Sequence, residues 1–191
     1  MHGTHHRKAA IHMRLFLTIM MSFGLLLASE ATSGQEKTTI WVAAMNGNMK
    51  SVQKYVKNGV SVDTINSNKT TPLMMAAFNG HTELVKWLLT QNANIHLEDV
   101  QGRTALIYCS SGPFVETLEL LLKNKANVNH ADKDEGFTAL MFASSEGHFP
   151  NVKILVKYNA DPTLKDKDGD TALAHASKNK HTAIAEYLSK I

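Results

Sequence analysis

A string of seven residues recurs along the chain at a nearly fixed interval. Versions of it begin at Thr38, Thr71, Thr104, Thr138 and Thr171 as TTIWVAA, TPLMMAA, TALIYCS, TALMFAS and TALAHAS. The successive spacings are 33, 33, 34 and 33 residues. A period of this length is typical of stacked supersecondary units, each of which buries its apolar face only against its neighbours. The sequence therefore predicts an all-α solenoid of about five repeating units.

The second unit shows why each repeat forms a pair of helices. Thr71 is suited to cap a helix, and Pro72 can occupy the first helical position, where its missing N–H is not needed. Gly80 predicts a turn with a positive φ, after which a second helix begins near Thr82. The apolar stripe predicted for that second helix consists of Leu84, Val85, Leu88 and Leu89.

These strings resemble the ankyrin repeat family, whose pattern reads G-x-TPLHxAAxxGH and then VVxLLLxxGADxN. The best match is TPLMMAAFNGHTELVKWLLTQNANIH, residues 71–96, and similar strings occupy residues 102–129 and 136–162. The resemblance implies an ankyrin domain over residues 35–191. Its units would cover about 35–67, 68–100, 101–134, 135–167 and 168–191. It also implies a concave face of inner helices and finger loops that binds other proteins.

Some positions depart from the family pattern. The family's histidine after TPL is replaced in every unit, which predicts the loss of a capping hydrogen bond. The replacing residues are Trp41, Met74, Ile107, Met141 and Ala174. Pro113 and Phe114 predict a shifted turn between the helices of unit three. Lys125 stands where other units have Gly or Asn, so a strained positive φ is expected there.

The first 31 residues have the layout of a leader. Starting at Met13, one arginine precedes an apolar run from Leu15 to Leu27, and small residues follow, as in a secretory signal peptide. The run is about 13 residues, whereas a spanning helix needs about 20, so a stable membrane anchor is the weaker interpretation. We expect Met13 to be the true start, with a cut between Ala31 and Thr32 and a cut after Ser33 as the alternative. The domain would then be periplasmic.

Charge and composition limit the classes of partner. From residue 32 onward there are 17 basic and 16 acidic residues, so the domain has no net charge that would attract nucleic acid. The single cysteine excludes an internal disulfide framework. We expect a monomer that binds a folded protein.

Motifs for catalysis are absent: the chain has no HExxH, GxSxG, Walker loop, GxGxxG or CxxC. His81, His148 and His181 share one repeat position, about 10 Å apart from unit to unit, too far to bind one metal ion. The acidic runs at residues 132–135 and 166–170 are interpreted as solvated turns. We therefore expect no catalytic, cofactor or metal site. A reactive thiol at Cys109, working with His175, is the alternative from another class.

One variable position suggests a partner site. It reads Val42, Met75, Tyr108, Phe142 and His175 from unit to unit, and apolar residues exposed there would form a patch that soluble monomers rarely leave uncovered. The competing interpretation is that these residues pack against neighbouring units. The residues assigned to partner binding are Met45, Met75, Phe78, Arg103, Tyr108, Phe137, Phe142 and His175.

An exported ankyrin stack with no further domain resembles bacterial self-protection ankyrins. That resemblance implies an inhibitor that occludes a partner, with a secreted cell-wall hydrolase such as a peptidoglycan endopeptidase as the expected target. A periplasmic scaffold, a neutraliser of another toxin class such as a lipase, and a protein tethered by an uncleaved leader remain as alternatives.

Overall fold

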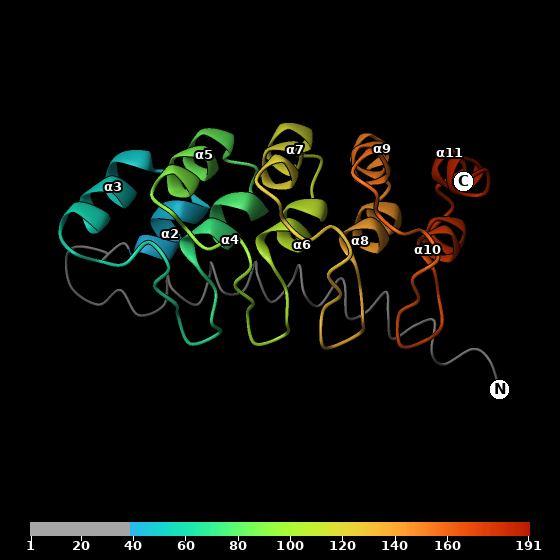
Figure 1. The fold of residues 1–191 in the computed structure, drawn as a ribbon, viewed down its shortest axis with the longest axis horizontal. Helices are drawn as coiled ribbons and strands as arrows, with labels where there is room; N and C mark the ends of the chain where they lie inside the picture. Colours follow the sequence, from blue (N-terminus) through green and yellow to red (C-terminus); the bar gives the residue numbers. More distant parts are fainter. Residues whose placement is uncertain (1–38) are drawn as a thin grey trace, which may run out of the picture. The chain divides into compact units, whose positions relative to one another are not determined.

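The computed structural model describes residues 39–191, which form a row of five helical hairpins (Figure 1). The leader, the start at Met13 and the cut before Thr32 lie outside the described residues. The inner helices are α2 (Ile40–Met45), α4 (Pro72–Phe78), α6 (Ala105–Ser110), α8 (Ala139–Glu146) and α10 (Ala172–Lys178). The outer helices are α3 (Met49–Lys57), α5 (Thr82–Thr90), α7 (Val115–Lys123), α9 (Phe149–Lys157) and α11 (Thr182–Leu188).

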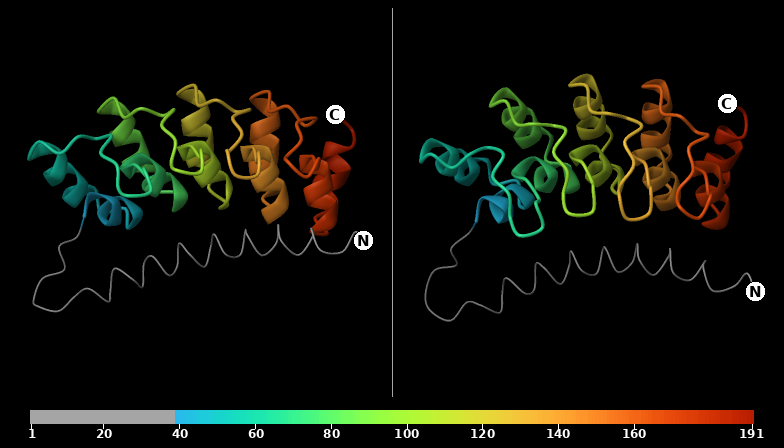
Figure 2. Two further views of the ribbon diagram at one scale, coloured as in Figure 1. Left: turned by 90° about the horizontal axis from the view of Figure 1, so that it is seen from below. Right: turned by 60° about the horizontal axis from the view of Figure 1, so that its bottom comes forward.

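The hairpins stack in sequence order, so that the inner helices form one layer and the outer helices a second layer (Figures 1 and 2). Long loops extend from the inner layer on the side away from the outer helices (Figure 1). We call residues 66–70, 99–103, 132–137 and 166–170 the finger loops. The predicted all-α solenoid is confirmed for the described residues, in which the sole strand-like pairing is an isolated bridge between Ala131 and Thr138.

The inner helices begin as the sequence predicts. Thr71 Oγ1 accepts a hydrogen bond from the backbone N–H of Met74 at 3.2 Å, and Pro72 is the first residue of α4. The predicted loss of a capping bond is wrong in units two and four. Met74 Sδ accepts from the Thr71 N–H at 3.5 Å, and Met141 Sδ accepts from the Thr138 N–H at the same distance. A thioether thus occupies the acceptor position of a capping box.

The turns also follow the predicted backbone. Gly80 has φ 66°, and Lys125 has φ 66°, the left-handed conformation expected at that position. Unit three differs, because Gly112 does not adopt a positive φ. The Phe114 ring fills the space beside it: a Cβ on Gly112 would lie 2.2 Å from that ring, and one on Gly80 would lie 2.1 Å from it. The predicted shift of this turn is therefore confirmed.

The core runs along the stack where adjacent hairpins meet. One small residue of each inner helix is at most 1% exposed and allows the helices to approach closely: Ala43, Ala76, Cys109, Ala143 and Ala176. The outer helices contribute the fully buried side chains of Val52, Val85, Leu118 and Val152. Each buried aliphatic side chain contributes about 1.5–3 kcal/mol, so the fold is maintained by contacts between neighbouring units.

Candidate functional site

The side chains assigned to partner binding are mostly inaccessible. Met75, Tyr108 and Phe142 are only 5%, 3% and 4% exposed. Arg103, Phe137 and His175 are also buried, whereas Met45 and Phe78 are half-buried. The expected exposure of the apolar ladder is therefore wrong at Met75, Tyr108, Phe142 and His175, which are buried as the competing packing interpretation predicts. The reason is that these side chains pack against the finger loops and against neighbouring units.

Tyr108 fills the space between α6 and its own finger loop. Its hydroxyl donates to Asp99 Oδ2 at 2.8 Å, and its ring packs edge-on against Phe78 of the preceding unit at 6.0 Å. The other oxygen of Asp99 accepts from the backbone N–H groups of Gln101 and Arg103, each at 2.8 Å. Burial, followed by the neighbouring Asp99 carboxylate, raises the pKa of Tyr108. This tyrosine is therefore held as a neutral hydrogen-bond donor.

In the next finger loop, the carboxylate of Asp132 is paired with a side chain from the preceding finger loop. Phe142 has no polar group to offer Asp132, and Arg103 Nε instead donates to Asp132 Oδ2 at 3.4 Å. The Arg103 guanidinium also lies over the Phe142 ring, 5.8 Å from its centroid. Phe137 packs edge-on against Phe142 at 5.2 Å. Arg103 therefore links unit three to unit four, whereas Phe137 packs within unit four, and both are buried.

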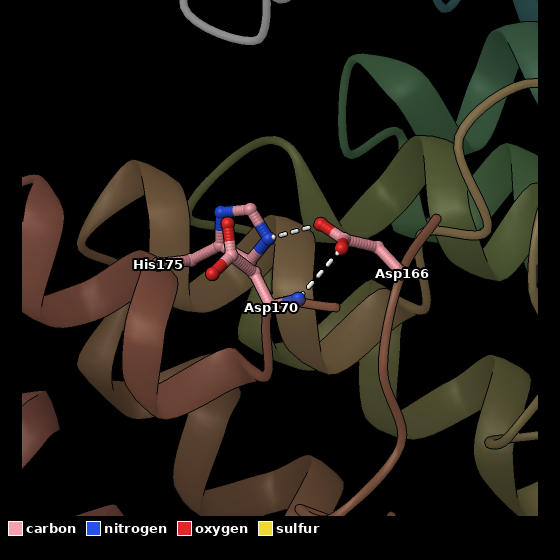
Figure 3. A group of neighbouring side chains, drawn as sticks. All are labelled: Asp166, Asp170 and His175. Carbon is pink, nitrogen blue, oxygen red and sulfur yellow. Dashed lines mark hydrogen bonds and ion pairs between the residues drawn. The ribbon is translucent and has the colours of Figure 1, made fainter. Parts of the chain in front are cut away.

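The fifth unit repeats the arrangement with a histidine. His175 Nε2 lies 2.8 Å from Asp166 Oδ2, and Asp166 Oδ1 accepts from the backbone N–H groups of Asp168 and Asp170 at 3.0 and 2.8 Å. Figure 3 shows the three side chains of Asp166, Asp170 and His175 gathered at this point. Phe137 packs edge-on against the His175 ring at 4.7 Å.

The buried finger-loop carboxylates were missed by the sequence analysis, which interpreted the runs that contain Asp132 and Asp166 as solvated turns and assigned no role to Asp99. Asp99, Asp132 and Asp166 are 5%, 4% and 8% exposed. A signal was present in the sequence: Asp99 precedes Tyr108 by nine residues, and Asp166 precedes His175 by nine residues. An acid and a donor at one recurrent spacing, one in the loop and one on the following helix, indicate a contact between a finger loop and the inner helix that follows it.

The surface that remains open lies on the finger loops and on the first inner helices. Ile65 and Val100 are 51% and 55% exposed, and Met45 and Phe78 are half-buried on α2 and α4. Backbone hydrogen bonds join each finger loop to the next. They connect Val100 N to Asn68 O at 3.0 Å, Lys133 N to Gln101 O at 2.8 Å and Lys167 N to Glu135 O at 2.8 Å. The loops therefore form one connected face.

The three histidines at one repeat position connect adjacent units, as expected for structural residues. Each contacts a backbone carbonyl of the preceding inner helix through Nε2. The pairs are His81 with Met45 O at 2.8 Å, His148 with Ser111 O at 3.1 Å and His181 with Ser145 O at 3.0 Å.

The alternative of a reactive thiol finds no support in the surroundings of Cys109. Its side chain is fully buried in α6, and burial raises the pKa of the thiol, which opposes formation of the thiolate that nucleophilic chemistry needs. Its sulfur lies 3.7 Å from the Phe114 carbonyl oxygen, an acceptor that does not activate it.

The fold and this connected face define a repeat protein that binds other proteins. The family model for ankyrin repeats (three copies) matches residues 40–132 and 110–191. The chain therefore belongs to the ankyrin repeat family, whose members are typically binding modules without catalysis of their own. No curated protein matches the chain. Within residues 39–191, the helices lack the length and apolar character that crossing a membrane requires.

Proposed function

We propose that this chain is an exported protein-binding module that blocks a partner enzyme by covering it. The observation that carries the proposal is the connected row of finger loops, with Ile65 and Val100 exposed beside the half-buried Met45 and Phe78. Loops joined by backbone hydrogen bonds lose little entropy on binding, which favours a tight and specific complex. Export is supported by the leader pattern in residues 13–31.

The proposed target is a secreted cell-wall hydrolase, with a peptidoglycan endopeptidase as the first candidate. This part of the proposal rests on the resemblance to bacterial self-protection ankyrins. A periplasmic scaffold would use the same surface without changing the activity of its partner. An immunity protein against a lipase-type toxin would differ only in the enzyme that it blocks.

The decisive experiment measures inhibition. The exported chain is used to capture partners from the periplasm of its own organism, and each captured hydrolase is assayed on peptidoglycan with and without the chain. Loss of peptidoglycan cleavage at equimolar chain would support the proposed target. A captured enzyme with unchanged activity would favour the scaffold, and a blocked lipase would favour the other immunity class. The mass of the secreted chain, read in the same preparation, locates the cut.

The binding surface can be tested with exposed residues only. Ile65→Asp and Val100→Asp place charges on the finger-loop face, and we expect each to weaken partner binding by about tenfold or more. Ile191→Asp is the matched control, because Ile191 is 56% exposed at the other end of the stack. Equal effects of all three substitutions would contradict the assignment of the surface.

A further inference from the structure

The end of the fifth finger loop and the start of α10 bring together three side chains that bind metals in other proteins. Asp166, Asp170 and His175 each offer a ligand atom, and these atoms lie within 4.8 Å of one another. Asp166 and His175 are buried, with side chains 3% and 7% exposed, and Asp170 is partly exposed. Beside them, Lys178 forms an ion pair with Asp170.

We propose that Asp166, Asp170 and His175 form a binding site for a divalent transition-metal ion of the Zn²⁺ type. One imidazole and two carboxylates are a ligand set that suits such ions. Histidine and carboxylate atoms each lie about 2.1 Å from a bound Zn²⁺, so ligand atoms 2.8 Å apart subtend about 84° at the metal. The observed distance from His175 Nε2 to Asp166 Oδ2 is 2.8 Å. A tetrahedral ion needs the two atoms about 3.4 Å apart, so it can replace the proton between them once they separate by about 0.6 Å.

The ligands are also positioned by their surroundings. Asp166 Oδ1 is held by two backbone N–H groups, which leaves Oδ2 directed at His175 (Figure 3). The Phe137 ring packs against the imidazole at 4.7 Å and limits its rotation. Such outer contacts orient metal ligands and raise metal affinity in proteins. Two of the three ligands are thus already ordered in the folded chain, so metal binding loses little further conformational entropy on their account.

The third ligand requires a small change that the structure allows. Two ligands of one Zn²⁺ are at most about 4.2 Å apart, and the three ligand atoms here lie within 4.8 Å of one another, so no more than a small inward turn of the Asp170 carboxylate is needed. It is held at present by the ammonium group of Lys178, whose side chain is 40% exposed and can move into water. Metal binding therefore requires His175 in the tautomer that carries its proton on Nδ1, with Nε2 free to bind the ion, and it displaces Lys178 from Asp170.

Among the described residues, this ligand set occurs only at the last finger loop and α10. At the positions of Asp170 and His175, unit three has Arg103 and Tyr108, and unit four has Phe137 and Phe142. A guanidinium is permanently protonated and offers no ligand atom, and a phenyl ring offers none either. The same finger-loop arrangement thus places a tyrosine hydroxyl beside the loop carboxylate before α6 and a set of metal ligands before α10.

The test uses the full chain and Zn²⁺ as the probe. Titration calorimetry is expected to show one Zn²⁺ bound per chain at this site, and Co²⁺ is expected to give visible absorption bands typical of a site with few ligands. His175→Gln keeps a donor for Asp166 and removes the imidazole. We expect this variant to lose the single-site event while retaining its helical circular dichroism. The histidines before Met13 are the same in every variant, so the difference between variants reports on this site.

A second variant acts in the opposite direction and does not disturb the core. Lys178→Met frees Asp170 and is expected to tighten Zn²⁺ binding about 2–5-fold, as the loss of a competing exposed ion pair requires. Lys153→Met, which removes the same charge far along the chain, is expected to leave the affinity unchanged. The proposal is overturned if His175→Gln binds Zn²⁺ with the stoichiometry and affinity of the parent chain. It is also overturned if Lys178→Met and Lys153→Met shift the affinity equally.

Discussion

At the scale of single residues, three of the four finger loops each depend on one buried aspartate that uses both of its oxygens. Asp99, Asp132 and Asp166 each hold loop N–H groups with one oxygen and accept a side-chain donor with the other. Unit two has the neutral Asn66, whose Oδ1 accepts from the N–H groups of Asn68 and Thr70. A buried carboxylate needs a donor on each oxygen, because an unpaired one carries its full desolvation cost.

We therefore expect Tyr108→Phe to lower the free energy of unfolding by about 1–3 kcal/mol, because Asp99 loses a buried donor. The measurement is urea unfolding followed by circular dichroism. Tyr187→Phe is the control, since Tyr187 packs its ring on Phe149 in a half-buried position. We expect that control to change stability by less than about 0.5 kcal/mol. Equal effects of the two substitutions would contradict the role given to the Asp99 contact.

Glu146 makes stability depend on pH in a defined direction. Burial raises the pKa of this carboxyl at the end of α8, against the opposing charges of His148 and His181. A raised pKa means that the folded chain holds this proton more tightly than the unfolded chain, so this stabilisation is lost as pH rises through the folded pKa. We expect Glu146→Gln to stabilise the chain at pH 7 relative to the parent and not at pH 3.5. Thermal melting at both pH values measures the difference, and the exposed Glu186→Gln should show none.

At the scale of the elements, helix capping is the feature that varies from unit to unit. Thr71, Thr138 and Thr171 each accept a hydrogen bond from the third residue of their helix, whereas Thr104 does not cap α6 in this way. We expect Thr138→Ala to lower the free energy of unfolding by about 1 kcal/mol, which is the usual contribution of a cap. Thr104→Ala, at a buried equivalent position, should cost measurably less in the same chemical denaturation. The reverse order would contradict this account.

A hydrogen bond from a side chain to the backbone joins the loops that follow the outer helices in neighbouring units. At one place in the described residues this bond is absent. Asp63 Oδ1 accepts from Asn94 N at 2.9 Å, and Asn129 Oδ1 accepts from Asp161 N at 2.8 Å, so each ties one unit to the next. His96 occupies the same position between units two and three. Within residues 39–191 it makes no such bond to Asn127, and a shallow groove of about 330 Å³ lies beside it, lined in part by Asn92 and Asn124.

Restoring that contact should stabilise the chain. His96→Asp places a carboxylate where Asp63 and Asn129 lie in their own units, within reach of the Asn127 N–H. We expect an increase of about 0.5–1.5 kcal/mol in the free energy of unfolding, the usual net value of one hydrogen bond. His96→Ala separates this gain from the simple removal of histidine and should give no increase. The measurement compares the denaturant midpoints of the parent chain and the two variants. An equal gain in both variants would contradict the claim that His96→Asp restores a hydrogen bond to Asn127.

The elements could be predicted from the sequence because they depend on local residues. Thr71, Pro72 and Gly80 specify helix starts and turns within a few residues of themselves, and the 33-residue period repeats that information. The accessibility of Tyr108 and Phe142 could not be predicted in this way. It depends on finger loops that fold back over the inner helices, held by Asp99 and by the Arg103–Asp132 pair between units. The nine-residue spacing from Asp99 to Tyr108 indicates one of these contacts, whereas the Arg103–Asp132 pair leaves no recurrent spacing in the sequence.

At the scale of the whole molecule, stability is a sum of contacts between neighbouring units, so position in the row matters. The outer helix α3 packs chiefly on α2, whereas the central helices have neighbours on both sides. Lys54 of α3 stands where the other outer helices have Trp87, Leu120, Ile154 and Tyr187. A polar residue there suits an end unit and removes apolar contact with its neighbour. The first unit should therefore be the least protected part of the described stack.

Hydrogen exchange measured by mass spectrometry tests this order directly. We expect amides of α6 and α8 to exchange only through global unfolding, because both faces of these helices are covered by neighbouring units. Amides of α3 should exchange through a local opening of lower free energy, with α11 next, since α11 contacts α9 and α10 on one side only. Lys54→Leu is expected to slow exchange in α3 and to leave α8 unchanged. Uniform protection along the stack, or equal slowing in α3 and α8, would mean that the five units unfold as one body and not as neighbours in a row.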